Sequence, residues 1–184
     1  MEFRIVLFIV GIISNSLLII GLLISILKPK YRIWPPPRKN SWQFIVSWIF
    51  IYLSYLSIIL LGIFDWDSFL LIHYLRFPFG IAFIFIGLGL FYWGIRTLSL
   101  HSSYGLEGEF ITSGPYKFTR NPQYLGDILF FMGLIIVTNS LLTLIVVVIG
   151  IIWNVLTPFS EEPWLRNLYG AKYDEYCKKV RRFI

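Results

Sequence analysis

The chain has 184 residues, of which 57% are hydrophobic, 19% are aromatic and only 14% are charged. Soluble domains carry about 25% charged residues, so this composition excludes an ordinary soluble domain and indicates an all-α, polytopic membrane protein. We expect one domain over residues 1–184. The net charge is +6, and a positive charge is expected of a protein whose loops lie against anionic inner-leaflet lipid. Because the cations lie beside apolar runs and form no separate basic domain, we expect no nucleic-acid partner.

Five apolar runs in chain order predict transmembrane helices, at about residues 3–27, 42–64, 77–98, 123–138 and 141–158. A hydrocarbon core about 30 Å thick requires about 20 apolar residues per helix. The first run is about twice as long as a signal-peptide core, and no A-x-A-like cleavage site follows it, so we expect a retained span. Only Thr138-Asn139-Ser140 separates the last two runs, which predicts a tight helical hairpin.

Charge predicts the orientation of these five helices, because loops rich in Lys and Arg stay on the cytoplasmic side. Five cations lie in loop 28–41, three lie in segment 96–122 and six lie after residue 158. The connection 65–68, with sequence DWDS, is acidic. We therefore expect the N-terminus outside, and the C-terminus and any functional site in the cytoplasm.

The segment 114–124, GPYKFTRNPQY, lies where the fourth span begins. Asn121 is expected to cap this helix and Pro122 to occupy its first position. These two roles do not explain the aromatic and cationic residues around them, Tyr116, Lys117, Arg120 and Tyr124. A helix N-terminus beside Arg120 can bind a carboxylate or a phosphate, and the tyrosine rings can face a base or a cation. An ordinary helix start is the alternative.

Two adjacent acids, Glu161 and Glu162, follow the fifth apolar run. At the C-terminal end of a helix they would face the negative pole of its dipole, so we expect compensating partners. They are candidates to bind a cation or the hydroxyls of a ribose, and solvated interfacial acids are the alternative. The predicted hairpin brings them close to Arg120. An anion site, aromatic faces and two carboxylates together match S-adenosylmethionine as cofactor.

Two stretches of the chain also resemble a known family. GPYKFTRNPQYLG at 114–126 resembles the pattern GPY-x-x-x-R-[HN]-P-x-Y-x-G, and EEPWLRNLYGAKYDEYCKKVRRFI at 161–184 resembles E-E-x-x-L-x-x-x-x-G-x-x-Y-x-x-Y-x-x-x-V-x-R-F. Both patterns are typical of the integral membrane methyltransferases that include isoprenylcysteine carboxyl methyltransferase and phosphatidylethanolamine methyltransferase. Asn121 favours the phospholipid branch and the tail after Gly170 favours the isoprenylcysteine branch, so the branch stays open.

The resemblance implies a site built from residues of about 85–184. Its cofactor-binding residues would be Gly87, Gly89, Gly114, Tyr116, Arg120, Asn121, Pro122, Tyr124, Gly126, Glu161 and Glu162. Arg120, Glu161 and Glu162 would be catalytic, and the C-terminal segment would form a cytoplasmic amphipathic helix that covers the cofactor. For Gly87 and Gly89, close packing of membrane helices is the alternative.

The expected reaction is methyl transfer to a lipophilic acceptor that enters from the bilayer. The acceptor would be an isoprenylcysteine carboxylate or a phospholipid amine, and an amine would need a base, for which Glu161, Glu162 and Asp127 are candidates. Two alternatives remain: an NADPH-dependent membrane reductase of the sterol reductase type, and a non-catalytic lipid-binding protein. We expect no metal, because His73 and His101 fall at opposite ends of the third span.

Overall fold

The computed structural model describes residues 2–69 and 74–183, and this part of the chain is helical and contains no strand. The long helices are α1 (Glu2–Leu27), α2 (Trp42–Phe64), α3 (Arg76–Leu98), α5 (Pro122–Thr138) and α6 (Leu141–Tyr169). Shorter elements are α4 (Leu100–Ser103), α7 (Ala171–Lys179) and two 3₁₀ turns at Pro29–Tyr31 and Gly114–Lys117. The all-helical prediction is confirmed.

Among the described residues, four helices are long and apolar enough to cross a membrane: α1, α2, α3 and α6. Helix α5 has 17 residues and, at 1.5 Å per residue, is only about 25 Å long. The fifth span therefore stays a prediction. Helix α6 begins at Leu141 as expected, and the predicted span 141–158 covers only part of it. The helix has 29 residues and reaches Tyr169, passing through Pro158 and Pro163.

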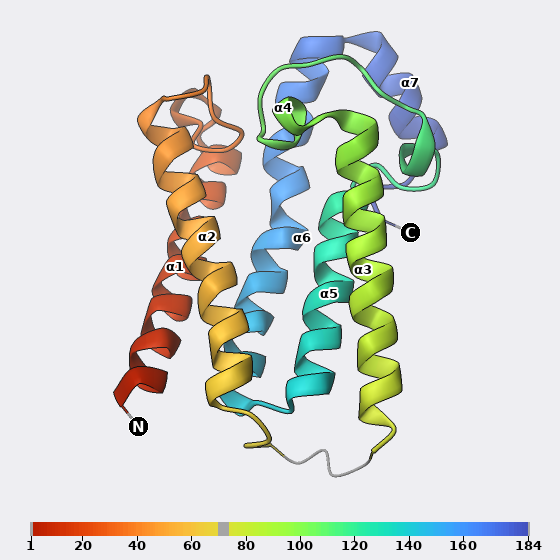
Figure 1. Ribbon diagram of the computed structural model, residues 1–184. Coiled ribbons are helices and arrows are strands. Elements are labelled where there is room, and N and C mark those ends of the chain that lie inside the picture. The colour runs from red at the N-terminus through yellow and green to blue at the C-terminus, as the bar shows by residue number, and fades with distance from the viewer. Residues whose placement is uncertain (1, 70–73, 184) are drawn as a thin grey trace.

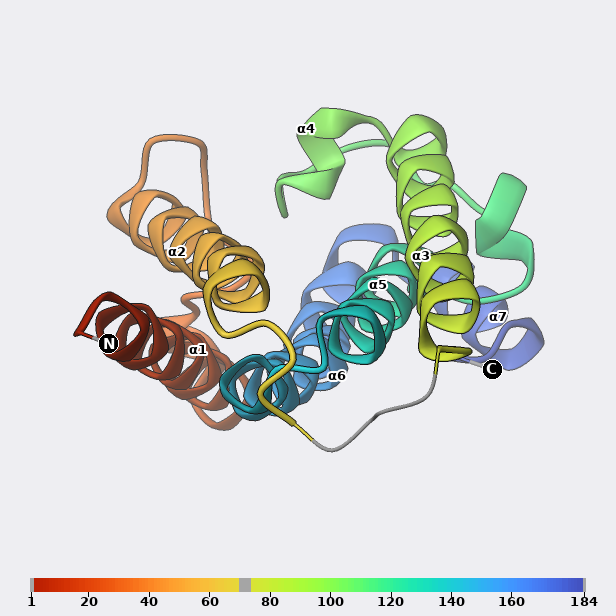
Figure 2. The same ribbon diagram turned by 60° about the horizontal axis from the view of Figure 1, so that its bottom comes forward.

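Helices α5 and α6 occupy the middle of the bundle, with α1 and α2 on one side and α3 on the other (Figures 1 and 2). Helix α3 packs mainly on α5, whereas α1 packs on both α2 and α6. The α1–α2 loop, α4 and α7 lie at one end of the bundle, at the top of Figure 1. The N-terminus and the α5–α6 turn lie at the other end, so the three cationic segments share one end of the molecule.

At the far end, the Asp65 carboxylate joins three long helices. Its oxygens accept hydrogen bonds from Ser68 Oγ at 2.6 Å, Ser140 Oγ at 2.8 Å and the Leu142 N–H at 3.2 Å, and Arg4 Nη1 lies 3.1 Å away. Burial by itself would raise the pKa of Asp65, but these hydrogen bonds and the Arg4 charge bring it below its ordinary value. Asp65 thus ties the end of α2 to the starts of α1 and α6.

Helices α3 and α5 approach closely where Gly87 faces Gly126. A Cβ atom on Gly87 would lie 2.6 Å from the Gly126 carbonyl oxygen and 2.5 Å from the Phe130 nitrogen. A Cβ atom on Gly126 would lie 2.7 Å from the Gly87 carbonyl oxygen. These distances are too short for any side chain, so the two glycines allow the backbones to touch, as small residues do in membrane helix pairs.

Candidate functional site

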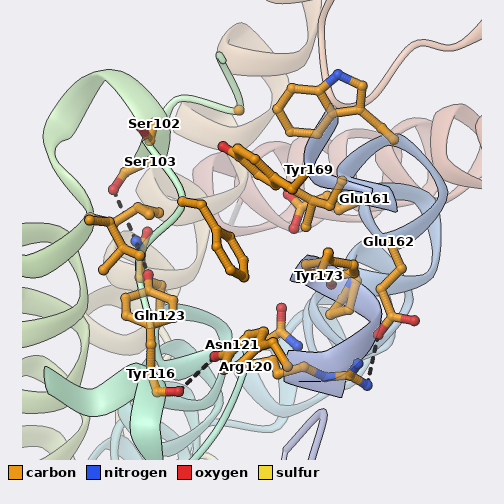
Figure 3. Close-up of a pocket in the computed structure, with 18 of the residues that line it drawn as sticks. Ser102, Ser103, Tyr116, Arg120, Asn121, Gln123, Glu161, Glu162, Tyr169 and Tyr173 are labelled. Carbon is orange, nitrogen blue, oxygen red and sulfur yellow. Dashed lines mark hydrogen bonds and ion pairs between the residues drawn. The ribbon is translucent and has the colours of Figure 1, made fainter. Parts of the chain in front are cut away.

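A pocket with a free volume of about 110 Å³ lies at the end of the bundle where the cationic segments gather. Its walls come from the loop after α3, the start of α5, the last turns of α6, and α7 (Figure 3). Its polar and aromatic lining residues are Ser102, Ser103, Glu109, Phe110, Tyr116, Arg120, Asn121, Gln123, Tyr124, Glu161, Glu162, Trp164, Tyr169, Tyr173 and Tyr176.

The Glu161 carboxylate is held through one of its two oxygens. Oε1 accepts hydrogen bonds from Trp34 Nε1 at 2.8 Å and from the Tyr124 hydroxyl at 2.5 Å. No donor among the described residues hydrogen-bonds the second oxygen, Oε2. Because Glu161 lines the pocket, this second oxygen is available to a ligand.

Glu162 is bound by guanidinium groups instead. Arg182 approaches it with Nε at 2.7 Å and Nη2 at 2.8 Å, Arg120 Nη2 lies at 3.1 Å and Arg166 Nη2 at 3.9 Å. Figure 3 shows its carboxylate directed at Arg120 and the Glu161 side chain directed elsewhere, because successive helical residues are rotated by about 100°. The hydrogen bond to Glu162 raises the pKa of Arg182, so this contact stays ionic.

The helix dipole is not the reason that Glu161 and Glu162 have compensating partners, contrary to the expectation from the sequence. They do not lie at a helix C-terminus, because α6 continues to Tyr169, and the helix dipole acts mainly within the last turn. Burial is the actual reason, since the Glu162 side chain is only 7% exposed. A buried carboxylate requires charged partners, and the arginines provide them.

The end of the described chain is tied to the segment before α5. The Arg120 N–H donates to the Arg181 carbonyl at 3.0 Å, and Thr119 Oγ1 and Asn121 Nδ2 donate to the Arg182 carbonyl at 3.0 and 2.9 Å. Asn121 occupies the N-cap position of α5, as expected, but its side-chain amide is used in this contact and makes no cap hydrogen bond.

Arg120 has one unsatisfied donor. Its side chain is 10% exposed, and its Nε atom is buried without an acceptor among the described residues. Leaving a buried donor unpaired costs about 1–3 kcal/mol, and such groups call for an absent partner. An oxygen atom of an anionic ligand would satisfy it.

Aromatic rings complete the walls of the pocket. Phe110 packs on Tyr169 with ring centroids 5.0 Å apart, and it contacts Tyr173 and Tyr176 edge to face. The Tyr176 hydroxyl donates to the Tyr116 carbonyl at 2.6 Å. Burial raises the pKa of Tyr116, Tyr173 and Tyr176, so these phenols stay neutral. A planar heterocycle could stack against such walls.

The structure brings together six of the residues that the sequence indicated: Tyr116, Arg120, Asn121, Tyr124, Glu161 and Glu162. The other five do not line the pocket. Pro122 is the first residue of α5, as expected, and Gly114 occupies a turn with φ of +57° against Thr97. Gly87 and Gly126 form the α3–α5 contact, and an added Cβ on Gly89 would meet nothing within 4 Å. Cofactor roles for these five residues stay predictions.

Sequence reasoning missed three contributors to the site. Trp34 comes from the α1–α2 loop, Gln123 donates to Ser103 and Tyr116, and Arg182 comes from the tail. Two of them had a local signal, because Gln123 lies inside the GPYKFTRNPQY segment and Arg182 is the arginine of the V-x-R-F end of the second motif. Trp34 had none.

Two further expectations concern other polar residues. Asp127 does not line the pocket; it is buried in the bundle, where Tyr55 hydrogen-bonds its carboxylate. His73 lies outside the described residues. Within residues 2–69 and 74–183, no three His, Cys, Asp or Glu residues are placed to hold a metal ion, and the absence of a metal stays a prediction.

Comparison with known proteins identifies the family. The phospholipid methyltransferase family matches residues 75–172, which is more than half of the chain. The chain belongs to the phospholipid methyltransferase family. Its four long apolar helices agree with this membership, and the protein is an integral membrane protein.

A curated relative in this family is phosphatidylethanolamine N-methyltransferase B of Dictyostelium discoideum. It is 29% identical over 98 residues, a match that covers 50% of this chain and 48% of the relative. The chain thus spans about half the length of the curated relative it matches. No solved structure matches the chain.

The family match contains most of the pocket but not all of it. The loop after α3, α5, α6 and the start of α7 fall within residues 75–172. Trp34, which binds Glu161, and Arg182, which binds Glu162, fall outside it. Segments on both sides of the family match therefore complete the site.

Proposed function

We propose that this member of the phospholipid methyltransferase family transfers a methyl group from S-adenosylmethionine to a lipophilic acceptor in the membrane. The observation that carries the proposal is the polar chemistry of the pocket. Its lining includes Arg120, whose buried Nε has no acceptor among the described residues, and Glu161, one oxygen of which has no donor there, between aromatic walls.

These groups fit the cofactor. Arg120 Nε would donate to its carboxylate, Glu161 Oε2 would bind its ammonium group or ribose hydroxyls, and the rings around Phe110 would hold its adenine. S-adenosylmethionine supplies, when bound, a methyl group on a positively charged sulfur. The chain's own task is to align the reactants and exclude water, and such positioning is worth about 7–11 kcal/mol in well-oriented reactions.

The acceptor we favour is the amine of a phospholipid, in keeping with the name of the curated relative. As an amine nitrogen forms a new bond to carbon, it must release a proton. No donor among the described residues engages Glu161 Oε2, and a carboxylate oxygen has two lone pairs. It can therefore accept a hydrogen bond from the cofactor with one lone pair and the amine proton with the other. Glu162 is unsuited to this task, since the arginines around it hold it as a carboxylate.

A second cavity matches the apolar part of such an acceptor. It has a volume of about 200 Å³, lies between α1 and α2, and is lined by aliphatic and aromatic side chains that include Leu22, Phe50 and Trp153. Trp34 also lines this cavity while its indole N–H reaches Glu161. The acceptor's acyl chain and the polar pocket would thus be separated by one indole ring.

For the topology, we propose five spans with the N-terminus outside and with the C-terminus and pocket in the cytoplasm. The support is the segregation of charge: residues 28–41, 96–122 and 159–184 carry fourteen of the sixteen cations and lie at one end of the bundle (Figure 1). Such loops stay cytoplasmic. Helix α5 would be the short fifth span beside α6.

The test is calorimetric titration of the detergent-purified protein with S-adenosylhomocysteine, alongside NADPH. The Glu161→Gln variant keeps the shape of the side chain and removes its charge, and Glu175→Gln on the exposed face of α7 is the matched control. We expect saturable binding that weakens about tenfold in Glu161→Gln, as for the loss of one charged hydrogen bond, and stays unchanged in Glu175→Gln.

Absence of S-adenosylhomocysteine binding, or saturable binding of NADPH in its place, would contradict the proposal and favour a reductase. The acceptor is tested separately, with labelled S-adenosylmethionine and vesicles that contain phosphatidylethanolamine or a prenylated cysteine. Label in the phospholipid supports the amine. Label in the prenylated cysteine alone would remove the need for a base at Glu161, because a carboxylate releases no proton when it is methylated.

A further inference from the structure

Trp34 is remote in sequence from every other part of the pocket, yet it binds a carboxylate there. It lies 127 residues before Glu161 and donates from Nε1 to Glu161 Oε1 at 2.8 Å. The family match begins only at residue 75. The loop between α1 and α2 thus supplies a contact that the matched region cannot supply.

The indole ring is fixed on several sides. The backbone N–H of Trp34 donates to Ser25 Oγ at 3.0 Å, and the ring meets Trp48 edge to face with centroids 6.2 Å apart. A Cβ atom on Gly105 would lie 3.1 Å from Trp34 Cζ2, so the loop after α3 packs directly on the ring. Trp34 is only 8% exposed, which leaves its N–H little freedom to turn away from Glu161.

The two donors on Oε1 come from different parts of the fold. Tyr124 belongs to α5, whereas Trp34 belongs to the α1–α2 loop. A glutamate side chain rotates readily about its last torsion, and a single donor would leave that rotation open. Two donors converging on one oxygen fix the plane of the carboxylate and direct Oε2 to one place.

We propose that Trp34 is a positioning residue that orients Glu161 through its indole N–H, an inference that rests on the proposed function of this site. The region before the family match then has a catalytic purpose besides anchoring. It holds the carboxylate in the geometry in which Oε2 meets the ligand.

The test compares two tryptophan-to-phenylalanine variants. Trp34→Phe keeps an aromatic ring and removes the N–H that binds Glu161. Trp48→Phe removes an indole N–H that is buried without an acceptor among the described residues, so it controls for loss of ring size. We expect kcat to fall about tenfold in Trp34→Phe, as for one hydrogen bond to a charged group. KM for S-adenosylmethionine should rise no more than in Glu161→Gln, the thermal midpoint should change little, and Trp48→Phe should retain wild-type kcat.

A double-variant comparison separates positioning from a structural role. If Trp34 acts through Glu161, Trp34→Phe should change kcat less than twofold when Glu161 is already Gln, because the oriented carboxylate is gone. An equal tenfold loss in both backgrounds would overturn the inference.

The outcomes also separate this inference from the proposed function. A wild-type protein that neither binds S-adenosylhomocysteine nor transfers methyl groups overturns the function, and the positioning role falls with it. An active wild-type protein whose Trp34→Phe variant has the same kcat as Trp48→Phe overturns the inference alone.

Discussion

At the residue scale, Glu161 and Glu162 follow one another on α6 and meet different partners. Glu161 accepts hydrogen bonds from neutral donors and keeps one oxygen available, whereas Glu162 is surrounded by guanidinium groups. The sequence indicated the pair as a unit. Their separate partners, at residues 34 and 182, are visible only in three dimensions.

This difference predicts that two matched substitutions have unequal effects on the free energy of unfolding. Glu162→Gln should lower the free energy of unfolding by about 2–3 kcal/mol, less than for a fully buried pair because Arg166 and Arg182 are partly exposed. Glu161→Gln should leave it nearly unchanged. Thermal unfolding in detergent measures both, and equal midpoints for the two variants would refute the assignment of Glu162 as the structural acid.

Activity should show the reverse order. Glu161→Gln should lower kcat at least about a hundredfold if the side chain is the base for an amine acceptor, with the fold intact. Methyl transfer to phosphatidylethanolamine vesicles measures this loss. A Glu161→Gln variant with wild-type kcat would show that another group takes the proton.

At the element scale, the α3–α5 contact depends on two of the four glycines that the motif comparison indicated. Gly87→Ala and Gly126→Ala should each destabilise the protein by about 1–3 kcal/mol, because the new Cβ overpacks a backbone contact. Gly89→Ala, with open space around it, should be neutral. Midpoints of thermal unfolding decide the matter, and a destabilised Gly89→Ala would contradict the packing explanation.

The far end of the bundle should lose stability in acid through Asp65. The native pKa of Asp65 is lowered, so its contribution is complete above its unfolded pKa of about 3.9 and is lost as pH falls through the native pKa. The unfolding midpoint of Asp65→Asn should therefore fall less between pH 6 and pH 3 than that of the wild type. Parallel pH curves would refute this, and Asp174→Asn on exposed α7 is the control.

The sequence predicted the elements well where hydropathy determines them. The second run, 42–64, coincides with α2, and the third differs from α3 by one residue. Hydropathy missed the last turns of α6, because the apolar run stops near Pro158 while the helix does not. Those turns are held by contacts of Glu161 and Glu162 with distant segments, which no local pattern encodes.

At the scale of the whole molecule, the proposed topology predicts which sites are open to the medium. With the native thiol removed by Cys177→Ser, a cysteine at exposed position 2 or 39 can report its side. A membrane-impermeant maleimide should label Glu2→Cys in intact cells and Lys39→Cys only after permeabilisation. The opposite pattern would invert the orientation.

The same scale explains how much of the site the sequence could predict. Six pocket residues were indicated because they fall in two compact motifs that the hairpin of α5 and α6 brings together. Trp34, the loop after α3 and Arg182 joined the pocket through long-range packing. Trp34 and the loop after α3 lie in no motif, and the motif that contains Arg182 does not show that it binds Glu162. Only the fold reveals these contacts.

The two sides of the pocket are held by different numbers of hydrogen bonds and ion pairs, and this difference indicates which side can open. On one side, Arg181 and Arg182 hold residues 119–121 by three hydrogen bonds, and Arg182 and Arg120 both grip Glu162. On the other side, a single hydrogen bond among the described residues joins the loop after α3 to α6: the Tyr169 hydroxyl donates to the Gly108 carbonyl at 2.8 Å, beside the Phe110 ring.

The wall of the pocket that is held by fewer hydrogen bonds should open more easily. We therefore expect ligands to enter and leave between Tyr169 and Gly108, while the wall formed by the tail stays in place. Tyr169→Phe, which removes only this hydrogen bond, should then speed both the association and the release of S-adenosylhomocysteine. Its equilibrium affinity should change far less than either rate.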